Sequence, residues 1–318
     1  MKYRQITSSE RYAIAALRRR GLSVREIAAE LERSPSTISR EVRRNRNNDL
    51  RYEPFKADSR TRGRRSRSRR NSHFSRRDWR TVERYLRKKW SPEQISCTLG
   101  KAGILSISHE TIYIHIWRDR KRDGDLWKCL RQAGKKRRKR YGSYDSRGRL
   151  AGKRHISERP PEVETRSVIG HWEIDTVMGN DHARHCIVTI VERATGFLKI
   201  GKLERHTAAE TAACCIRLIS DDRDRFKTIT SDNGTEFHDY AEIEKATGVE
   251  FYFATPHHAW ERGTNENTNG LIRQYLPKRT SMACVTQADC DAIAFELNSR
   301  PRKRLGYKTP KECYVQAR

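Results

Sequence analysis

The sequence predicts a multidomain chain in which two small all-α domains precede a larger domain of mixed α/β structure. Two sets of short helices with N-terminal capping residues occupy the first part of the chain, and strands alternate with amphipathic helices from about Thr165 onward. The excess of positive charge is confined to the first half. These observations predict all-α domains at residues 1–50 and 79–125, linkers at 51–78 and 126–160, and an α/β domain at 161–318.

The uneven distribution of charge indicates that the two halves of the chain have different functions. Residues 1–160 contain 46 lysines and arginines and 17 acidic residues, whereas residues 161–318 contain 22 and 23. The first half is therefore suited to neutralise the phosphates of nucleic acid, and the second can hold an acidic pocket. The sequence shows no export or lipidation signal and no apolar run near the roughly 18 residues that a membrane span needs. We expect a cytoplasmic protein that binds DNA and not a membrane.

The first helical set has the pattern of a helix-turn-helix. Capping boxes begin at Thr7 and Ser23, and Pro35 follows a serine cap at the start of the third helix. That helix carries small polar residues and arginines near its start, where a recognition helix meets base edges. The alternative is a solvated helix face. The residues expected to contact DNA are Arg25, Ser36, Thr37, Ser39, Arg40, Arg43 and Arg44.

A second helical set follows an arginine- and serine-rich tract at 59–80, which we interpret as a flexible linker that can lie along the DNA backbone. A capping box begins at Ser91, and a further helix is expected over Ser108–Trp117. This arrangement predicts a second helix-turn-helix domain, followed by a second basic linker. Its residues expected to contact DNA are His109, Thr111 and Tyr113.

Three acidic residues of the second half have the placement of a metal site. Asp175 lies in an apolar strand, Asp232 ends a later strand before an Asn-Gly turn, and Glu266 begins a helix after 33 intervening residues. Carboxylates from two strands and a helix can converge on hard cations such as Mg²⁺ or Mn²⁺. Two such cations, about 3.5–4 Å apart, activate the attacking oxygen and stabilise the leaving oxygen. The sequence therefore predicts phosphoryl transfer at a two-metal site.

Other acidic residues compete for roles in this site. Glu261 and Glu236 are alternatives to Glu266 for the third ligand. Helical geometry does not separate Glu261 from Glu266, because both lie near the expected start of the helix. Glu173 shares a strand face with Asp175 by period-two alternation, so it either supports the site or is structural.

Cysteine, histidine and tryptophan residues offer weaker candidates. The eight cysteines show neither a Cys-x-x-Cys pair nor zinc spacing, and we expect buried, reduced thiols. His257 and His258 are adjacent and diverge in direction, so a loop contact is favoured over metal binding. Trp260 either packs or stacks on a base.

Seven motifs distributed over residues 4–314 match one known group of proteins. They are STISREVRRN, SPEQIS and ISHETIY in the helical sets, and GHWEIDTVMG, TSDNGTEF, WERGTNENTNGLIRQYLPK and NSRPRKRLGYKTP in the second half. With these motifs the sequence resembles bacterial transposases of the insertion-sequence-30 (IS30) family, within the retroviral-integrase-like DDE superfamily.

The resemblance implies an RNase H-like catalytic fold, dependence on Mg²⁺, and cleavage and strand transfer at terminal inverted repeats. The family's triad falls on Asp175, Asp232 and Glu266, and its basic residue seven positions after the glutamate falls on Arg273. We expect Arg273 and Lys278 to contact DNA. A bacterial, nucleoid-associated protein is implied, and at least a dimer is expected because two DNA ends must be brought together.

Two other functions are compatible with parts of the sequence. A DNA-binding regulator would carry an inactive catalytic domain, but the acidic triad is intact. A plain RNase H-like nuclease would lack strand transfer, but two DNA-reading domains exceed what it needs. Transposition is therefore the favoured hypothesis.

Overall fold

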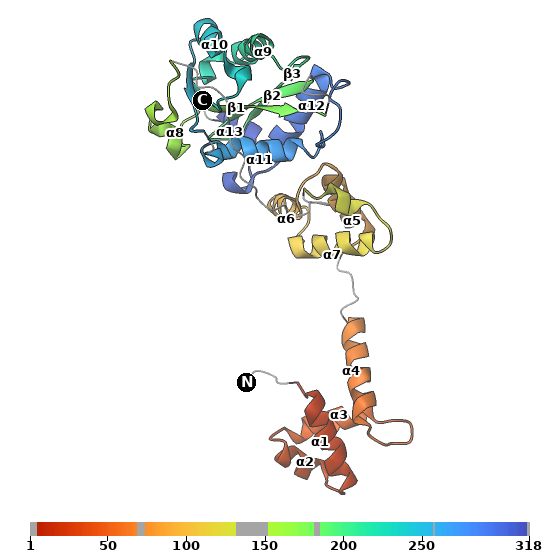
Figure 1. Ribbon diagram of the computed structural model, residues 1–318. Coiled ribbons are helices and arrows are strands. Elements are labelled where there is room, and N and C mark those ends of the chain that lie inside the picture. The colour runs from red at the N-terminus through yellow and green to blue at the C-terminus, as the bar shows by residue number, and fades with distance from the viewer. Residues whose placement is uncertain (1–4, 69–73, 132–151, 181–184, 257, 317–318) are drawn as a thin grey trace. The chain divides into compact units, whose positions relative to one another are not determined.

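The computed structural model describes residues 5–68, 74–131, 152–180, 185–256 and 258–316. The chain divides into two compact units, Met1–Arg77 and Asp78–Arg318, and each is described by itself. Figure 1 shows a helical N-terminal unit and a larger unit in which a sheet is covered by helices.

The N-terminal unit is the predicted helical set with one further helix. Thr7 and Ser23 both form capping boxes. Each side chain accepts a hydrogen bond from the backbone N–H of the glutamate three residues later, Glu10 or Glu26, and the carboxylate of that glutamate accepts from the backbone N–H of the capping residue. Ile14, Ile27 and Ile38 are fully buried where the helices meet. The helices are α1 (Ser8–Arg19), α2 (Val24–Glu30), α3 (Pro35–Asn45) and α4 (Pro54–Ser68).

Helix α4 corrects the prediction of a flexible linker, which is wrong for Pro54–Ser68. Ala57 on this helix is completely buried. The Arg60 guanidinium donates to the carbonyl oxygens of Asn45 and Arg46 at 2.6 and 2.9 Å, and Arg64 donates to the Asn45 side chain. Arg60 thereby satisfies backbone carbonyl groups that the end of α3 leaves without helical partners. Residues 69–73 of the expected linker lie outside the described residues.

The second helical set also forms as expected. The Ser91 capping box is closed by Gln94, and Ile95 and Ile112 are buried between the helices. Leu126 is buried in a 3₁₀ turn that packs on the last of these helices. The elements are α5 (Arg76–Arg87), α6 (Pro92–Lys101), α7 (His109–Arg120) and the 3₁₀ helix η1 (Leu126–Cys129).

A five-stranded mixed sheet forms the centre of the larger unit, as predicted. Its strand order is β3-β2-β1-β4-β5. The first three strands pair antiparallel, whereas β4 and β5 run parallel to β1. The strands are β1 (His171–Met178), β2 (Cys186–Glu192), β3 (Leu198–Leu203), β4 (Thr228–Ser231) and β5 (Glu250–Phe253).

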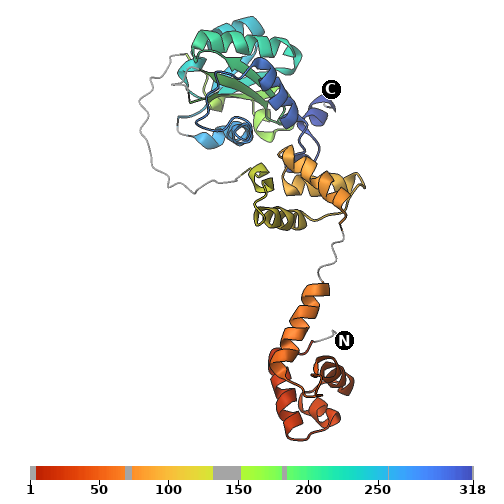
Figure 2. The same cartoon turned by 90° about the vertical axis from the view of Figure 1, so that its right-hand side faces the viewer.

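Helices cover both faces of this sheet (Figures 1 and 2). Trp172 and Ile174 of β1 belong to a core shared with α9 and α10, whereas Val177 belongs to a second core shared with α11 and α12. Because side chains alternate along a strand, Glu173 and Asp175 share the α11 side with Val177. The main helices are α9 (Ala208–Ser220), α10 (Tyr240–Thr247), α11 (Gly263–Ile272) and α12 (Gln287–Asn298), with shorter α8 (Glu162–Thr165) and α13 (Pro310–Gln316).

The predicted linker at 126–160 is packed at both ends. Besides buried Leu126, Arg159 is buried and donates to Thr230 of β4 at 3.0 Å. His155 forms an isolated bridge with Phe253 at the edge of the sheet. The linker interpretation is therefore wrong for these ends, and residues 132–151 lie outside the described residues.

The buried cation of the N-terminal unit allows a stability test. Arg11 is 4% exposed, donates to Glu41 at 2.8 Å and pairs with Asp58 of α4 at 3.1 Å. Breaking a fully buried ion pair costs about 3–5 kcal/mol, and that figure is an upper bound here because Glu41 and Asp58 are only partly buried. We expect Arg11→Met to lower hydrogen-exchange protection of α1 and α3 correspondingly, while exposed Arg18→Met leaves it unchanged. Equal protection in both variants would contradict the structural role of Arg11.

Candidate active site

Strand pairing brings two of the three predicted carboxylates to neighbouring strands. In the parallel pair of β1 with β4, Glu173 is opposite Thr230. Asp175 and Asp232 each stand two residues beyond this pair, Asp175 within β1 and Asp232 just after β4 ends. Parallel strands direct their carboxyl ends to the same edge of a sheet, so the two aspartates belong to one crevice.

The carboxylate of Asp175 is held by three groups. Asn269 of α11 donates its side-chain N–H to Oδ2 at 2.8 Å, and the backbone N–H of Thr176 donates to Oδ1 at 2.9 Å. The Arg262 guanidinium lies 3.7 Å from Oδ1. The pKa of Asp175 is raised to about 6: burial raises it most, Arg262 lowers it, and Asp232 adds a smaller increase. An acid in this position gains from nearby positive charge.

Asp232 faces the same cation. Its Oδ1 accepts from the backbone N–H of Gly234 at 3.0 Å, which fixes the turn after β4. Its Oδ2 accepts from Arg262 at 2.9 Å. Arg262 therefore bridges the two aspartates and compensates their charge where the sequence predicts metal ions.

Glu266 lies on the helix that faces these aspartates. It is exposed in the first turn of α11, four residues after Arg262 and three before Asn269. Positions at these spacings share one side of a helix, and both neighbours reach the aspartates. Glu266 thus shares a helix face with Arg262 and Asn269. Among the described residues, no three acidic, histidine or cysteine side chains stand close enough to form a ready metal cluster.

The competing glutamates have other partners. Glu261 accepts from the backbone N–H of Thr255 at 2.8 Å and contacts His258 at 3.2 Å, so it organises the loop before α11. Glu236 accepts from Thr176 at 2.8 Å. His206 approaches the same Glu236 oxygen at 3.3 Å. Because Glu236 helps to raise the pKa of Asp175, it contributes negative charge beside the site.

Glu173 anchors the helix that carries Glu266. It is completely buried, and its two oxygens accept from Arg193 at 3.0 Å and from the backbone N–H of Asn265 at 2.9 Å. The second bond ties the first turn of α11 to β1. Of the two roles left open for Glu173, the geometry favours support of the site.

Arg262 and Asn269 were not among the predicted site residues. Both stand at helical spacing from Glu266, and that spacing was the signal available in the sequence. Arg273, predicted to contact DNA, donates instead to the carbonyl oxygen of Met178 at 2.9 Å, and burial lowers its pKa. This bond ties the end of α11 to β1, and a phosphate contact by Arg273 stays a prediction. Lys278 is exposed.

The predicted DNA contacts of the N-terminal unit lie on its surface. Most of these side chains are exposed, and Thr37 is partly buried. A groove of about 520 Å³ runs beside α3 and is lined by Arg40, Arg44 and Thr37 together with Arg64 and Arg65 of α4. The two α4 arginines had been placed in the linker, because their tract was interpreted as unstructured.

The predicted contacts of α7 have mixed surroundings. His109 is exposed, and the Thr111 hydroxyl lies 2.9 Å from that of Ser108. Tyr113 is 38% exposed and lines a cleft against the sheet domain. In the loop before α11, His258 stacks on Trp260 at 4.3 Å, and Trp260 is 72% exposed. Trp260 is therefore not a core residue.

Comparison with known proteins identifies the family. Residues 2–45 match the helix-turn-helix domain family, and residues 166–259 match the integrase core domain family. The chain is 39% identical over 319 residues to the transposase of insertion sequence IS4351 from Bacteroides fragilis, covering 98% of this chain and 96% of that protein. It is 38% identical over 321 residues to the InsI transposase of IS30A from Escherichia coli K12, covering 96% and 82%. The chain belongs to the IS30 family of transposases.

This transposase therefore combines a helix-turn-helix domain with an integrase core domain. The chain is also similar in structure to the catalytic core domain of BIV integrase, at 23% identity. That match covers 47% of this chain and 96% of the integrase domain, with a TM-score of 0.37. In the described part of this chain, no helix is long and apolar enough to cross a membrane.

The raised pKa of Asp175 gives a pH test in the absence of divalent cations. Because the pKa of Asp175 is raised on folding, ionisation of this carboxyl lowers the stability of the folded protein. This loss of stability is absent below about pH 4 and is nearly complete above about pH 6. Asp175→Asn removes the ionisable group and should therefore raise the free energy of unfolding at pH 7.5 by up to about 3 kcal/mol, since each pKa unit corresponds to about 1.36 kcal/mol.

Thermal unfolding at pH 4.5 and 7.5 checks this expectation. The gain should shrink at the lower pH, and exposed Asp221→Asn should show no such dependence. A gain that is independent of pH would contradict the burial of a charged Asp175.

Proposed function

We propose that this transposase cuts and joins DNA strands at the terminal inverted repeats of its element, using Asp175, Asp232 and Glu266 as ligands of two divalent cations. The observation that carries the proposal is the bridge made by Arg262. One guanidinium contacts both aspartates from the residue next to α11, and Glu266 shares the helix face of Arg262 and Asn269.

The residues present fit a hard divalent cation. Carboxylate oxygens are the donors that Mg²⁺ and Mn²⁺ prefer. Burial and the negative charge of Asp232 both raise the pKa of Asp175, so positive charge between the two aspartates is favourable. Arg262 supplies that charge in this structure. When bound, two cations would supply an activated oxygen nucleophile and stabilise the leaving oxygen.

Several side chains of this chain prepare the site for that chemistry. Asn269 orients the Asp175 carboxylate, and the N–H of Gly234 orients that of Asp232. Glu173 fixes the start of α11, and Arg273 fixes its end. A pre-set arrangement of this kind lowers the cost of aligning the attacking and leaving oxygens.

We propose that DNA is recognised by both helical sets and not by the first alone. In the first set, α3 presents Arg40 and its exposed neighbours, and the arginines of α4 widen this basic surface. In the second set, α7 exposes His109 near its N-terminus, where recognition helices meet bases. Because two DNA ends must be joined, we propose a dimer or larger assembly on DNA.

The triad is tested by separating binding from chemistry. Asp175→Asn, Asp232→Asn and Glu266→Gln each keep the side-chain shape but remove a charged ligand. Each should abolish cleavage of end DNA in Mg²⁺, a loss of at least about 10³-fold, while binding persists.

Glu261→Gln is the matched control for Glu266→Gln, since glutamine can still accept from the Thr255 N–H. It should remain active. Near-normal cleavage by any of the first three variants would remove that residue from the triad. Joined DNA products distinguish a transposase from a nuclease, and binding without cleavage indicates a regulator.

Binding to the ends should depend strongly on salt. Each phosphate neutralised by lysine or arginine contributes a slope of about −0.9 in log affinity against log salt concentration. We expect a slope of several units for the full chain. Arg40→Ala should cost roughly 1–3 kcal/mol at one localised base position.

Arg64→Ala should instead weaken binding evenly across sequences, because a backbone contact carries no base information. Arg43→Ala is the matched comparison on α3. Affinity measurements with single-base variants of the end DNA separate these outcomes. A salt-insensitive affinity would contradict phosphate-dominated binding.

A further inference from the structure

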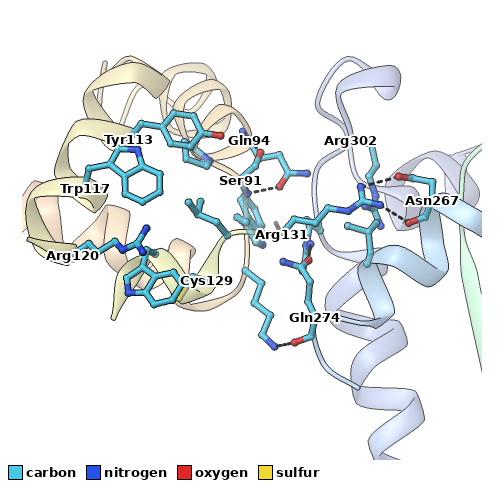
Figure 3. A pocket seen from close by; sticks show the side chains of 17 residues that line it. Ser91, Gln94, Tyr113, Trp117, Arg120, Cys129, Arg131, Asn267, Gln274 and Arg302 are labelled. Carbon is cyan, nitrogen blue, oxygen red and sulfur yellow. Dashed lines mark hydrogen bonds between the residues drawn. The ribbon is translucent and has the colours of Figure 1, made fainter. Parts of the chain in front are cut away.

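A cleft of about 870 Å³ lies between the second helical set and the sheet domain, within the larger unit (Figure 3). The two parts are joined around it by direct bonds. Gln94 of α6 donates to the carbonyl oxygen of Pro301 at 2.6 Å, and Lys303 pairs with Glu93 at 2.6 Å. Arg131 donates to the side chain and carbonyl of Asn267 at 2.9 and 3.0 Å. The cleft is thus a built feature of this unit.

One wall of the cleft is aromatic. Tyr113 and Trp117 extend from α7 (Figure 3), and Trp127 of η1 also lines the cleft. Trp117 is 44% exposed although it is a large apolar side chain. The Arg120 guanidinium lies over the Trp127 ring at 4.4 Å and over the Trp117 ring at 5.4 Å. This wall offers flat surfaces for stacking with positive charge beside them.

The opposite wall is cationic. Arg131, Arg300 and Arg302 line it, and Lys89 also lines the cleft. None of the seventeen described residues that line the cleft is acidic. The partners of these cations are neutral: Arg300 donates to Gln274 and to the Tyr275 hydroxyl, and Arg302 donates to the carbonyl oxygen of Leu297.

Charge is left uncompensated on this wall. Arg300 is 2% exposed, and its buried Nε has no hydrogen-bond partner. Burial and, to a smaller extent, the neighbouring arginines together lower the pKa of Arg302 to about 9. Buried cations without acidic partners are costly, so an anion bound in the cleft would be stabilising.

We propose that this cleft binds an unpaired segment of a DNA strand, with a base stacked on the aromatic wall and its phosphates facing the arginines. The proposal rests on the proposed function only in taking DNA as the ligand. The volume falls within the range of about 300–1,000 Å³ for ligand pockets and therefore suits one or two nucleotides. Ring faces and arginines are the combination that binds single strands, because only unpaired bases offer their faces.

The location gives this binding a consequence for the active site. The cleft is lined by Asn267 and Leu271 of α11 and by Gln274, which lies just after this helix. Asn267 directly follows Glu266. A strand in the cleft therefore lies against the helix that carries the third triad residue. The second helical set thereby acts as one side of the substrate channel in addition to reading duplex DNA.

The test compares two duplexes of the same sequence, one blunt and one with a single-stranded overhang of three nucleotides. Affinity of the full chain is measured by fluorescence anisotropy in EDTA, so that neither metal nor cleavage is required. Wild type should bind the overhang duplex about tenfold more tightly, as expected for one stacked base.

Two variants of the aromatic wall assign this preference to the cleft. Trp117→Ala and Arg120→Ala should each lose most of the tenfold preference and keep the affinity for blunt duplex. Arg118→Ala is the matched control, because Arg118 lies on the same helix, is exposed and does not line the cleft. It should keep the preference. Far-UV circular dichroism confirms that each variant is folded.

Equal affinity of wild type for the two duplexes would overturn the proposal, as would variants that weaken both duplexes equally. Repeating the comparison with element-end and unrelated sequences distinguishes a strand of the element end from a strand of target DNA. Asp175→Asn should keep the preference, so failure of the triad proposal and failure of this one are distinguishable.

Discussion

The parallel pairing of β1 with β4 is the constraint on which the catalytic part depends. It places Asp175 and Asp232 at one edge of the sheet, where burial and the negative charge of Asp232 raise the pKa of Asp175. The protein holds this arrangement with positive charge from Arg262 and with N–H donors from Asn269 and Gly234. A pair of carboxylates kept close at such a cost is typical of a functional site and not of a stabilising one.

Helix α11 transmits this arrangement to the rest of the larger unit. Glu173 binds its first turn to β1, and Arg273 binds its end to the last residue of the same strand. Its other side meets Arg131, which comes from the chain following the second helical set. The helix therefore contacts both the acidic crevice and the cationic cleft. A shift of α11 would alter both surfaces together.

The N-terminal unit follows a different principle. Its helices are short, and the buried Arg11 links α1 to Glu41 of α3 and Asp58 of α4. Glu41 also accepts from Asn45 and Tyr52 through the same oxygen. One partly buried carboxylate thus organises several elements of the DNA-binding unit. The arginines of α4 then extend its basic surface beside α3.

The sequence by itself determined the elements whose signals are local. Capping boxes at Thr7, Ser23 and Ser91 fixed three helix starts, because a cap and its partner lie three residues apart. Alternating apolar residues indicated the mixed sheet, and the motifs around Asp175 and Asp232 indicated the carboxylates that the strand pairing brings together.

Tertiary structure decided everything that depends on distant partners. Helix α4 has the composition of a linker and is ordered because Ala57 is buried and Arg60 binds the end of α3. Arg262 became the bridge between two aspartates only when α11 packed on β1. The cationic cleft brings Arg131 together with Arg300 and Arg302, although Arg131 is far from both of them in the chain. Local propensity contains no information on such pairings, because their energy comes from burial and charge in the folded chain.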